Sequence, residues 1–259
     1  MTRFLALFLV LLGGAANAQT VQQTLVDRST LALQEMLSDP DATQARSLMT
    51  KAKGAMICPS LFKAGFILGG QGGDCVMIGR GSGGGWSSPA FYGMGSGSIG
   101  LQLGLQDSEV LFIVLTDNGL RALLDSQFKI GGDASVAFAT LGGGVQGATT
   151  TALRADIVAF AKSRGLFAGL ALEGSVISQR SDWSQAYYGR MIDSHALVLN
   201  NDGQNPGAEP LKEMLARYAS AAPAEAAPAQ KYAPAPQAYQ APGYGAGSRV
   251  QSAPLPPPR

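Results

Sequence analysis

The sequence predicts a single α+β domain with a largely antiparallel, strongly bent, barrel-like sheet that is rich in glycine and packed by N-terminal and C-terminal helices. Fifteen of the forty-one residues from 65 to 105 are glycine, mixed with Val, Ile, Leu, Phe, Tyr and Trp. Glycine loses the most conformational entropy on folding, so such a segment folds only where its apolar neighbours are well buried. We therefore expect short, sharply bent strands here, with helical periodicity before and after them.

Two helices are expected before the sheet. Residues 21–37 place apolar side chains at roughly helical spacing until Pro40 stops the pattern. Residues 41–53 form the second helical segment, with Asp41 as a candidate N-cap and Gly54 where a helix-ending glycine would lie. The last turns of this segment carry a cluster of positive charge, formed by Arg46, Lys51 and Lys53.

Short strands are expected from residue 55 to residue 115. They are joined by Gly-Gly, Gly-Ser-Gly and Asp-Ser turns rather than by helices, which favours antiparallel pairing. The expected strands are residues 56–58, 64–68, 75–79, 90–105 in two pieces, and 110–115.

The second half of the domain alternates between helical and extended patterns. A helix is expected at residues 117–127, and further strands at 134–141, 157–161 and 166–177. A turn at 182–189, a strand at 196–199 and a closing helix at 209–218 follow. The folded unit is thus residues 19–220, a length that buries roughly 70 per cent of its unfolded surface in one core.

The first eighteen residues have the pattern of a secretory signal peptide. Arg3 precedes an apolar run at residues 4–12, and a small-residue segment ends at Ala18. This run is too short to span a bilayer, and no later segment is long and apolar enough to form a transmembrane segment. We expect an exported protein of the periplasm or cell envelope that begins at Gln19.

The charge balance gives no support to nucleic-acid binding. The chain has 19 basic and 18 acidic side chains, and loss of Arg3 with the signal peptide would leave 18 of each. A nucleic-acid-binding surface needs an excess of positive charge. We therefore expect no nucleic acid among the partners.

Cys58 and Cys75 are the two cysteines of the chain. In an exported protein they are expected to form a disulfide that closes a loop of about 17 residues and contributes about 3 kcal/mol. The alternative is a pair of buried thiols, since both cysteines have apolar neighbours.

Residues 221–259 are rich in Ala, Pro, Gln and Tyr and show no apolar periodicity. Such a segment cannot bury enough surface to offset the entropy of ordering, which predicts a disordered tail that is partly polyproline II. Residues 254–259 have the PxxPxR spacing of ligands for SH3 domains, although a stiff spacer fits an exported protein better. The tail could also bind an envelope protein, with Tyr232, Tyr239 and Tyr244 as contacts.

Three motifs suggest enzymes, and each is weak. The glycines at 95, 97 and 100 have dinucleotide-site spacing but precede a strand-like segment, whereas that motif requires a helix. Ser60 and Lys63 match the SxxK of penicillin-interacting enzymes without the other elements of that site. Asp193 and His195 stand near each other, but no GxSxG elbow is present. One histidine and two cysteines also leave too few ligands for a metal site, so we expect no metal, no cofactor and no catalysis.

Trp86 directly follows three glycines, residues 83–85. The arrangement suggests that the glycines open room for the indole to lie across neighbouring backbone. We expect Trp86 to be an anchor of the core rather than an exposed loop residue.

Six ordered motifs resemble the SYLF domain, also described as the Ysc84-type actin-binding domain, over about residues 25–218. They are Lys53-Gly-Ala-Met-Ile, Lys63-Ala-Gly-Phe, Trp86-Ser-Ser-Pro-Ala-Phe, Gly100-Leu-Gln-Leu-Gly, the run from Gly165 to Gly174, and Tyr187-Tyr-Gly189. The resemblance implies a binding module: eukaryotic members bind phosphoinositides, some fungal members bind actin filaments, and bacterial members look like exported envelope proteins.

From the resemblance and the charge cluster we expect peripheral binding of anionic phospholipid headgroups. Each basic residue near an anionic bilayer contributes about 1 kcal/mol. The expected headgroup contacts are Arg46, Lys51, Lys53, Lys63 and Arg80. The alternatives are an envelope scaffold that works through the Pro-rich tail, and filament binding as in the fungal members.

Overall fold

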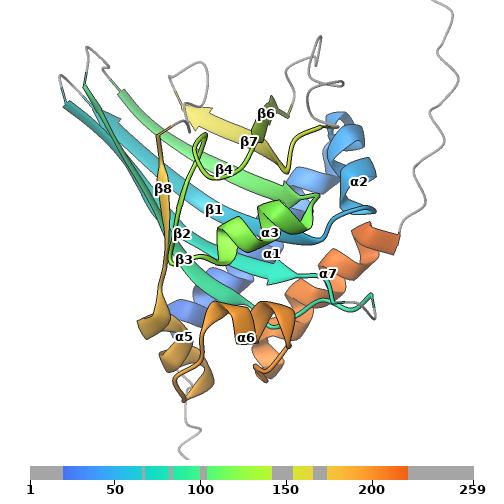
Figure 1. The fold of residues 1–259 in the computed structure, drawn as a ribbon. Coiled ribbons are helices and arrows are strands. Elements are labelled where there is room, and N and C mark those ends of the chain that lie inside the picture. Colours follow the sequence, from blue (N-terminus) through green and yellow to red (C-terminus); the bar gives the residue numbers. More distant parts are fainter. Residues whose placement is uncertain are drawn as a thin grey trace, which may run out of the picture. The chain divides into compact units, whose positions relative to one another are not determined.

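The computed structural model describes residues 20–65, 68–81, 84–99, 104–141, 154–165 and 174–220 (Figure 1). These residues form helices around one curled, eight-stranded sheet with the strand order β5-β8-β3-β2-β1-β4-β7-β6. The predicted α+β class is therefore confirmed. The expected signal peptide, the expected tail and most of the strand expected at 166–177 lie outside the described residues.

The central strand is β1, Gly54–Gly65, which pairs antiparallel with β2, Leu68–Gly79, and with β4, Gly104–Val114. The prediction of two separate strands at 56–58 and 64–68 was wrong, because one continuous strand runs through the Cys-Pro-Ser sequence. The register shifts between Ile57 and Phe62 on one side and between Cys58 and Leu61 on the other. Proline cannot donate a ladder hydrogen bond, and this bulge accommodates Pro59 without ending the strand.

The remaining strands extend the sheet on both sides. They are β3, Ala90–Ile99; β5, Gln127–Lys129; β6, Val136–Thr140; β7, Ile157–Gly165; and β8, Val176–Gln179. All described pairs are antiparallel except β6 with β7, which is parallel. The predicted largely antiparallel sheet is confirmed, and the glycine-rich residues 90–105 divide into β3 and the start of β4.

The helices are α1, Val21–Ser38; α2, Thr43–Met49; α3, Asp117–Leu124; α5, Ser181–Tyr188; α6, Ser194–Leu199; and α7, Glu209–Ser220, with 3₁₀ turns η1, Pro40–Ala42, and η2, Pro206–Ala208. The second expected helix is shorter than predicted, because it begins after η1 and ends at Met49. None of the helices in the described part of the chain is long and apolar enough to cross a membrane.

Two segments that we expected to be a turn and a strand are helices. The expected turn at 182–189 is α5, which ends at Gly189 in the left-handed conformation with φ 70°. The expected strand at 196–199 is α6, because the Asp193 side chain accepts a hydrogen bond from the backbone N–H of Ala196 at 2.7 Å and caps the helix. A short apolar run such as Leu197-Val198 does not by itself distinguish a strand from a buried helix.

The part of the sheet around the first half of β1 is buried on both faces. Its inner face packs against α3 and α6, and its outer face packs against α1, α2, α5 and α7; Figure 1 shows α1 and α3 on opposite sides of the sheet. Side chains alternate between the two cores along β1, with Met56 on the inner face and Ile57 on the outer face, both fully buried.

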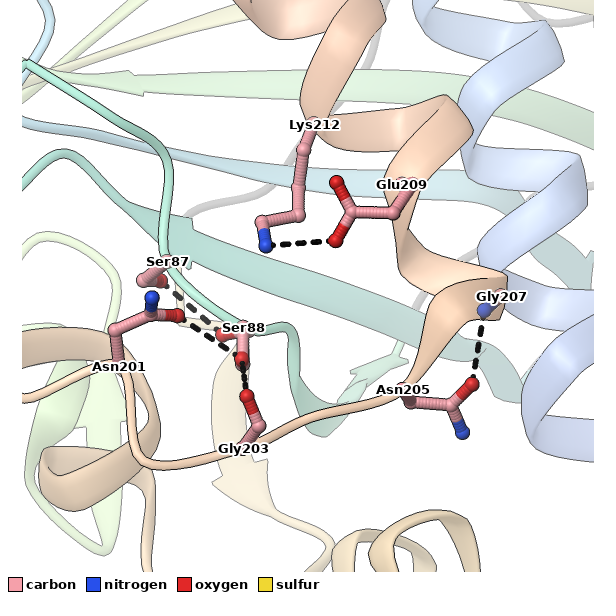
Figure 2. A network of polar contacts seen from close by, with 8 residues as sticks. All are labelled: Ser87, Ser88, Asn201, Gly203, Asn205, Gly207, Glu209 and Lys212. Carbon is pink, nitrogen blue, oxygen red and sulfur yellow. Dashed lines mark hydrogen bonds and ion pairs between the residues drawn. The ribbon is translucent and has the colours of Figure 1, made fainter.

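A polar network fastens the segment between α6 and α7 to the connection that precedes β3 (Figure 2). The Ser88 hydroxyl lies 3.0 Å from Asn201 Oδ1 and also contacts the carbonyl oxygen of Gly203. A Cβ on Gly203 would lie 2.6 Å from Leu197 Cδ2 and 2.8 Å from Ser88 Cβ, so only glycine fits. The contact places the end of α6 against residues 87 and 88.

Trp86 lies in the outer core with 5% of its surface exposed, so its predicted role as a core residue is confirmed. The prediction that the glycines open room for the indole was wrong for Gly84 and Gly85, because a Cβ on either would meet nothing within 4 Å. Gly84 instead supplies a turn with φ 81°, which lets Trp86 pair with Arg80 across an antiparallel bridge. Gly83 lies outside the described residues.

Replacing Trp86 with Ala should lower the free energy of unfolding by about 3–5 kcal/mol, because it removes a large side chain from the outer core. Chemical denaturation of both proteins measures the difference. Phe62→Ala is the control, since Phe62 is an aromatic residue that is 52% exposed and should change stability little. Equal stability of the wild type and Trp86→Ala would contradict a core role.

Candidate functional site

The predicted disulfide joins Cys58 on β1 to Cys75 on β2, with their Cα atoms 4.2 Å apart. Both cysteines are fully buried in the inner core. The register pairs Ile57 with Val76, so the two cysteines are direct cross-strand neighbours beside the β1 bulge. The bridge therefore links the two strands at the point where their register shifts, and the alternative of two free thiols does not hold.

Four of the five predicted headgroup contacts lie around the junction between α2 and β1. The backbone N–H of Arg80 donates to the carbonyl oxygen of Lys53 at 2.7 Å, and Arg80 Nη1 donates to the carbonyl oxygen of Thr50 at 3.0 Å. We call Lys51, Lys53 and Arg80 the basic junction. Arg46 lies on α2 beside it.

Lys63 does not join this group. It lies nine residues beyond Gly54 along β1, a distance of roughly 30 Å at the rise of an extended strand. Alternation along β1 from Leu61, which is in the inner core, places Lys63 on the inner face. The five predicted contacts therefore occupy two ends of the sheet.

Arg46 has a structural role that we did not predict. Its Nη1 donates to the carbonyl oxygens of Leu37 at 2.9 Å and Asp39 at 2.8 Å, and its Nη2 donates to Thr43 Oγ1 at 3.1 Å. These bonds satisfy carbonyls that the end of α1 leaves without helical partners. These hydrogen bonds would compete with any contact between Arg46 and a headgroup. In the sequence, only the position of Arg46 after a Pro-containing turn could have suggested its structural role.

The lysines of the basic junction are more accessible. Lys53 Nζ lies 3.0 Å from Asp117 Oδ1, but both side chains are about half exposed or more, at 48% and 63%. Exposed ion pairs contribute little and exchange partners readily. Lys51 is exposed and has no side-chain hydrogen bond or ion pair among the described residues.

A pocket of about 410 Å³ opens next to the basic junction. It is lined by Gly81, Gly85, Trp86 and Ser87 on one side and by residues 198–201 on the other. Arg80, the neighbour of Gly81, holds its guanidinium carbon 6.0 Å from the centroid of the Trp86 ring. The pocket lining includes Asn200 and Asn201, and the three basic residues of the junction lie outside the lining.

The structure places the described residues of the enzyme-like motifs in a strand, on opposite faces of β1 and at the start of α6. Glycines 95 and 97 lie within β3, and Gly100 lies outside the described residues. Ser60 Oγ donates to Asp107 Oδ1 at 2.6 Å on the outer face, opposite to Lys63. Asp193 caps α6, and His195 is exposed. No group of three or more His, Cys, Asp or Glu side chains in the described ranges could hold a metal ion.

The shifted pKa values also have structural causes. Hydrogen bonds from Thr116 and Ser135 lower the pKa of Asp156, which links α3 to the connection before β6. Burial raises the pKa of Tyr92 and Tyr188 above the usual value, so neither supplies a phenolate at neutral pH.

Comparisons with known proteins agree with the resemblance in the sequence. Residues 95–218 match the Ysc84 family, described as "Las17-binding protein actin regulator". "SH3 domain-containing YSC84-like protein 1" of Bos taurus is 31% identical over 177 residues, which cover 68% of this chain and 52% of that protein. The Homo sapiens protein of that name is 30% identical over the same length. "Protein YSC84" of Saccharomyces cerevisiae is 29% identical over 171 residues, or 65% of this chain and 36% of that protein.

The chain therefore spans about half the length of the mammalian relatives and about a third of the yeast protein. The similarity concerns the shared domain and not the whole of either relative.

Proposed function

Because its sequence match and its relatives support the Ysc84-type (SYLF) domain family, we propose that this chain binds anionic phospholipid headgroups peripherally and does not act as an enzyme. The observation that carries the proposal is the basic junction, where two exposed lysines lie beside Arg80, whose neighbour Gly81 lines an open pocket. Lys51 and Lys53 approach the bilayer surface, and Arg80 and the Asn side chains of the pocket hold the phosphate. Arg46 supports this site by fixing the end of α1.

The contribution of Lys51 and Lys53 can be measured by co-sedimentation with phosphatidylglycerol vesicles at low salt. Each lysine near an anionic surface contributes about 1 kcal/mol, so the variant Lys51→Ala/Lys53→Ala should bind about thirtyfold more weakly. The matched control, Arg28→Ala/Lys129→Ala, removes two exposed cations from other elements and should bind as the wild type does. Equal pelleting of the wild type and the lysine variant would contradict the assignment.

A protein ligand is the second candidate, favoured by the family description, which names Las17 binding and actin regulation. Actin filaments belong in the same co-sedimentation experiment for this reason. Pelleting with filaments and not with vesicles would replace the lipid proposal with filament binding. A scaffold role through residues 221–259 would instead leave vesicle binding weak in every variant.

We also propose that the protein is exported and that residues 1–18 are removed. The buried disulfide between Cys58 and Cys75 supports this, because such bonds persist in oxidising compartments. Mass spectrometry of protein produced from the full sequence in a bacterial host should find Gln19 as the first residue. Recovery of the intact N-terminus from the cytosolic fraction would contradict export.

A further inference from the structure

Beyond the bulge, the outer face of β1 exposes apolar side chains. Leu61 is in the inner core, so alternation places Phe62 and Ala64 on the outer face. Phe62 is 52% exposed, and Leu105 on β4 is 61% exposed. The register pairs Phe62 with Asp107 and Ala64 with Leu105, which makes Phe62 and Leu105 diagonal neighbours on one surface.

The inner face of the same strands carries polar side chains instead. Lys63 pairs in register with Gln71 on β2 and with Gln106 on β4. Gln71 is only 8% exposed and Gln106 only 2%. Gln106 Nε2 donates to Ser108 Oγ at 3.0 Å, but Gln106 Oε1 and both amide atoms of Gln71 have no hydrogen-bond partner in the part of the chain that the structure describes.

This distribution is the reverse of that in the rest of the domain. A single exposed apolar residue is ordinary, and so is a buried polar one that is fully hydrogen-bonded. Here exposed apolar residues and incompletely bonded buried amides occupy opposite faces of the same strands. The outer face of this region therefore has the character of a surface that meets an apolar environment.

No helix among the described residues covers this outer surface. The helix α1 crosses the sheet at the bulge, where Leu31 and Glu35 of α1 line a pocket with Pro59 and Asp107. Beyond it, Gly72 and Gly95 pair on the outer face, and a Cβ on Gly72 would meet nothing nearer than Met94 O at 3.5 Å. The described strands next to Phe62 and Leu105 therefore carry glycines, without side chains, on the outer face.

We propose that Phe62, Ala64 and Leu105, here called the outer distal patch, insert into the boundary between headgroups and acyl chains of a phospholipid bilayer. This inference rests on the proposed function and adds the apolar part of the membrane contact. A second copy of the chain fits less well, because two large side chains offer about 300 Å², whereas a stable dimer buries about 800 Å² per partner. A bilayer needs no complementary shape and accepts such side chains to a depth of about 5–10 Å.

Contact of both the patch and the basic junction with one bilayer would restrict how the domain lies on the membrane. They lie near opposite ends of β1, and α2 packs on the same outer face that carries the patch. Simultaneous contact requires β1 to lie roughly parallel to the membrane plane. The lysines then supply the salt-sensitive part of binding, and Phe62 and Leu105 supply the salt-resistant part.

The test uses the full chain with tryptophan at one of two exposed positions, Phe62→Trp or the control Val21→Trp, and vesicles that contain brominated acyl chains. Val21 is 65% exposed and lies at the start of α1. The wild-type emission, which comes from Trp86 and Trp183, is subtracted from that of each variant. On vesicle binding, the emission added by Phe62→Trp should shift to shorter wavelength and be quenched, and the emission added by Val21→Trp should not change. Phe62→Ser/Leu105→Ser should also lose at least tenfold of the binding that persists in high salt, whereas Val21→Ser/Met191→Ser should keep it.

The outcomes separate this inference from the proposed function. If the wild type binds vesicles but the Phe62→Trp protein shows neither quenching nor a shift, the insertion of the patch is overturned and headgroup binding stands. Insertion into neutral and anionic vesicles alike, unaffected by Lys51→Ala/Lys53→Ala, would support the patch and remove the headgroup proposal. No vesicle binding at all, with a dimer that Phe62→Ser/Leu105→Ser dissociates, would overturn the inference in favour of a second copy.

Discussion

The pairing of β1 with both of its neighbours is the constraint on which the rest of the structure depends. The first half of β1 contributes buried side chains to both cores. Met56 faces α3 and α6 in the inner core, and Ile57 faces the helices of the outer core. Burial on both faces requires an uninterrupted apolar run, and the sequence Ala-Met-Ile-Cys supplies it. The bulge at Pro59 and the adjoining disulfide keep the strand in register with β2 where the apolar run ends.

The position of the basic junction follows from this central strand. Lys53 immediately precedes β1, Arg80 immediately follows β2, and a backbone hydrogen bond of 2.7 Å between them continues the pairing of these strands. Arg80 then reaches the end of α2 through Thr50, while Arg46 ties α2 to α1. The backbone that carries the proposed headgroup contacts is thus attached to the buried first half of β1. This attachment limits the backbone entropy lost on binding.

The sequence was sufficient for the fold class, the antiparallel sheet and the burial of Trp86, because these depend on local patterns of glycine and apolar residues. Prediction from the sequence failed where tertiary contacts decide the secondary structure. Helix α6 depends on the cap by Asp193, and the continuity of β1 depends on a bulge that the spacing around Pro59 does not reveal. For the candidate site, the clustering of Lys51 and Lys53 in the sequence predicts their shared place between α2 and β1. It could not anticipate that Arg46 binds backbone carbonyls or that Lys63 lies on the inner face at the other end of the strand.

Native-state hydrogen exchange along β1, measured by NMR without lipid, tests most directly whether burial on both faces holds the sheet together. Both halves of the strand are hydrogen-bonded to β2 and β4, so they differ chiefly in burial. The account predicts that the amides of residues 55–58 open only with global unfolding, and that those of residues 62–64 exchange at least about tenfold faster through local opening. Equal protection of the two halves, or slower exchange in residues 62–64, would contradict it.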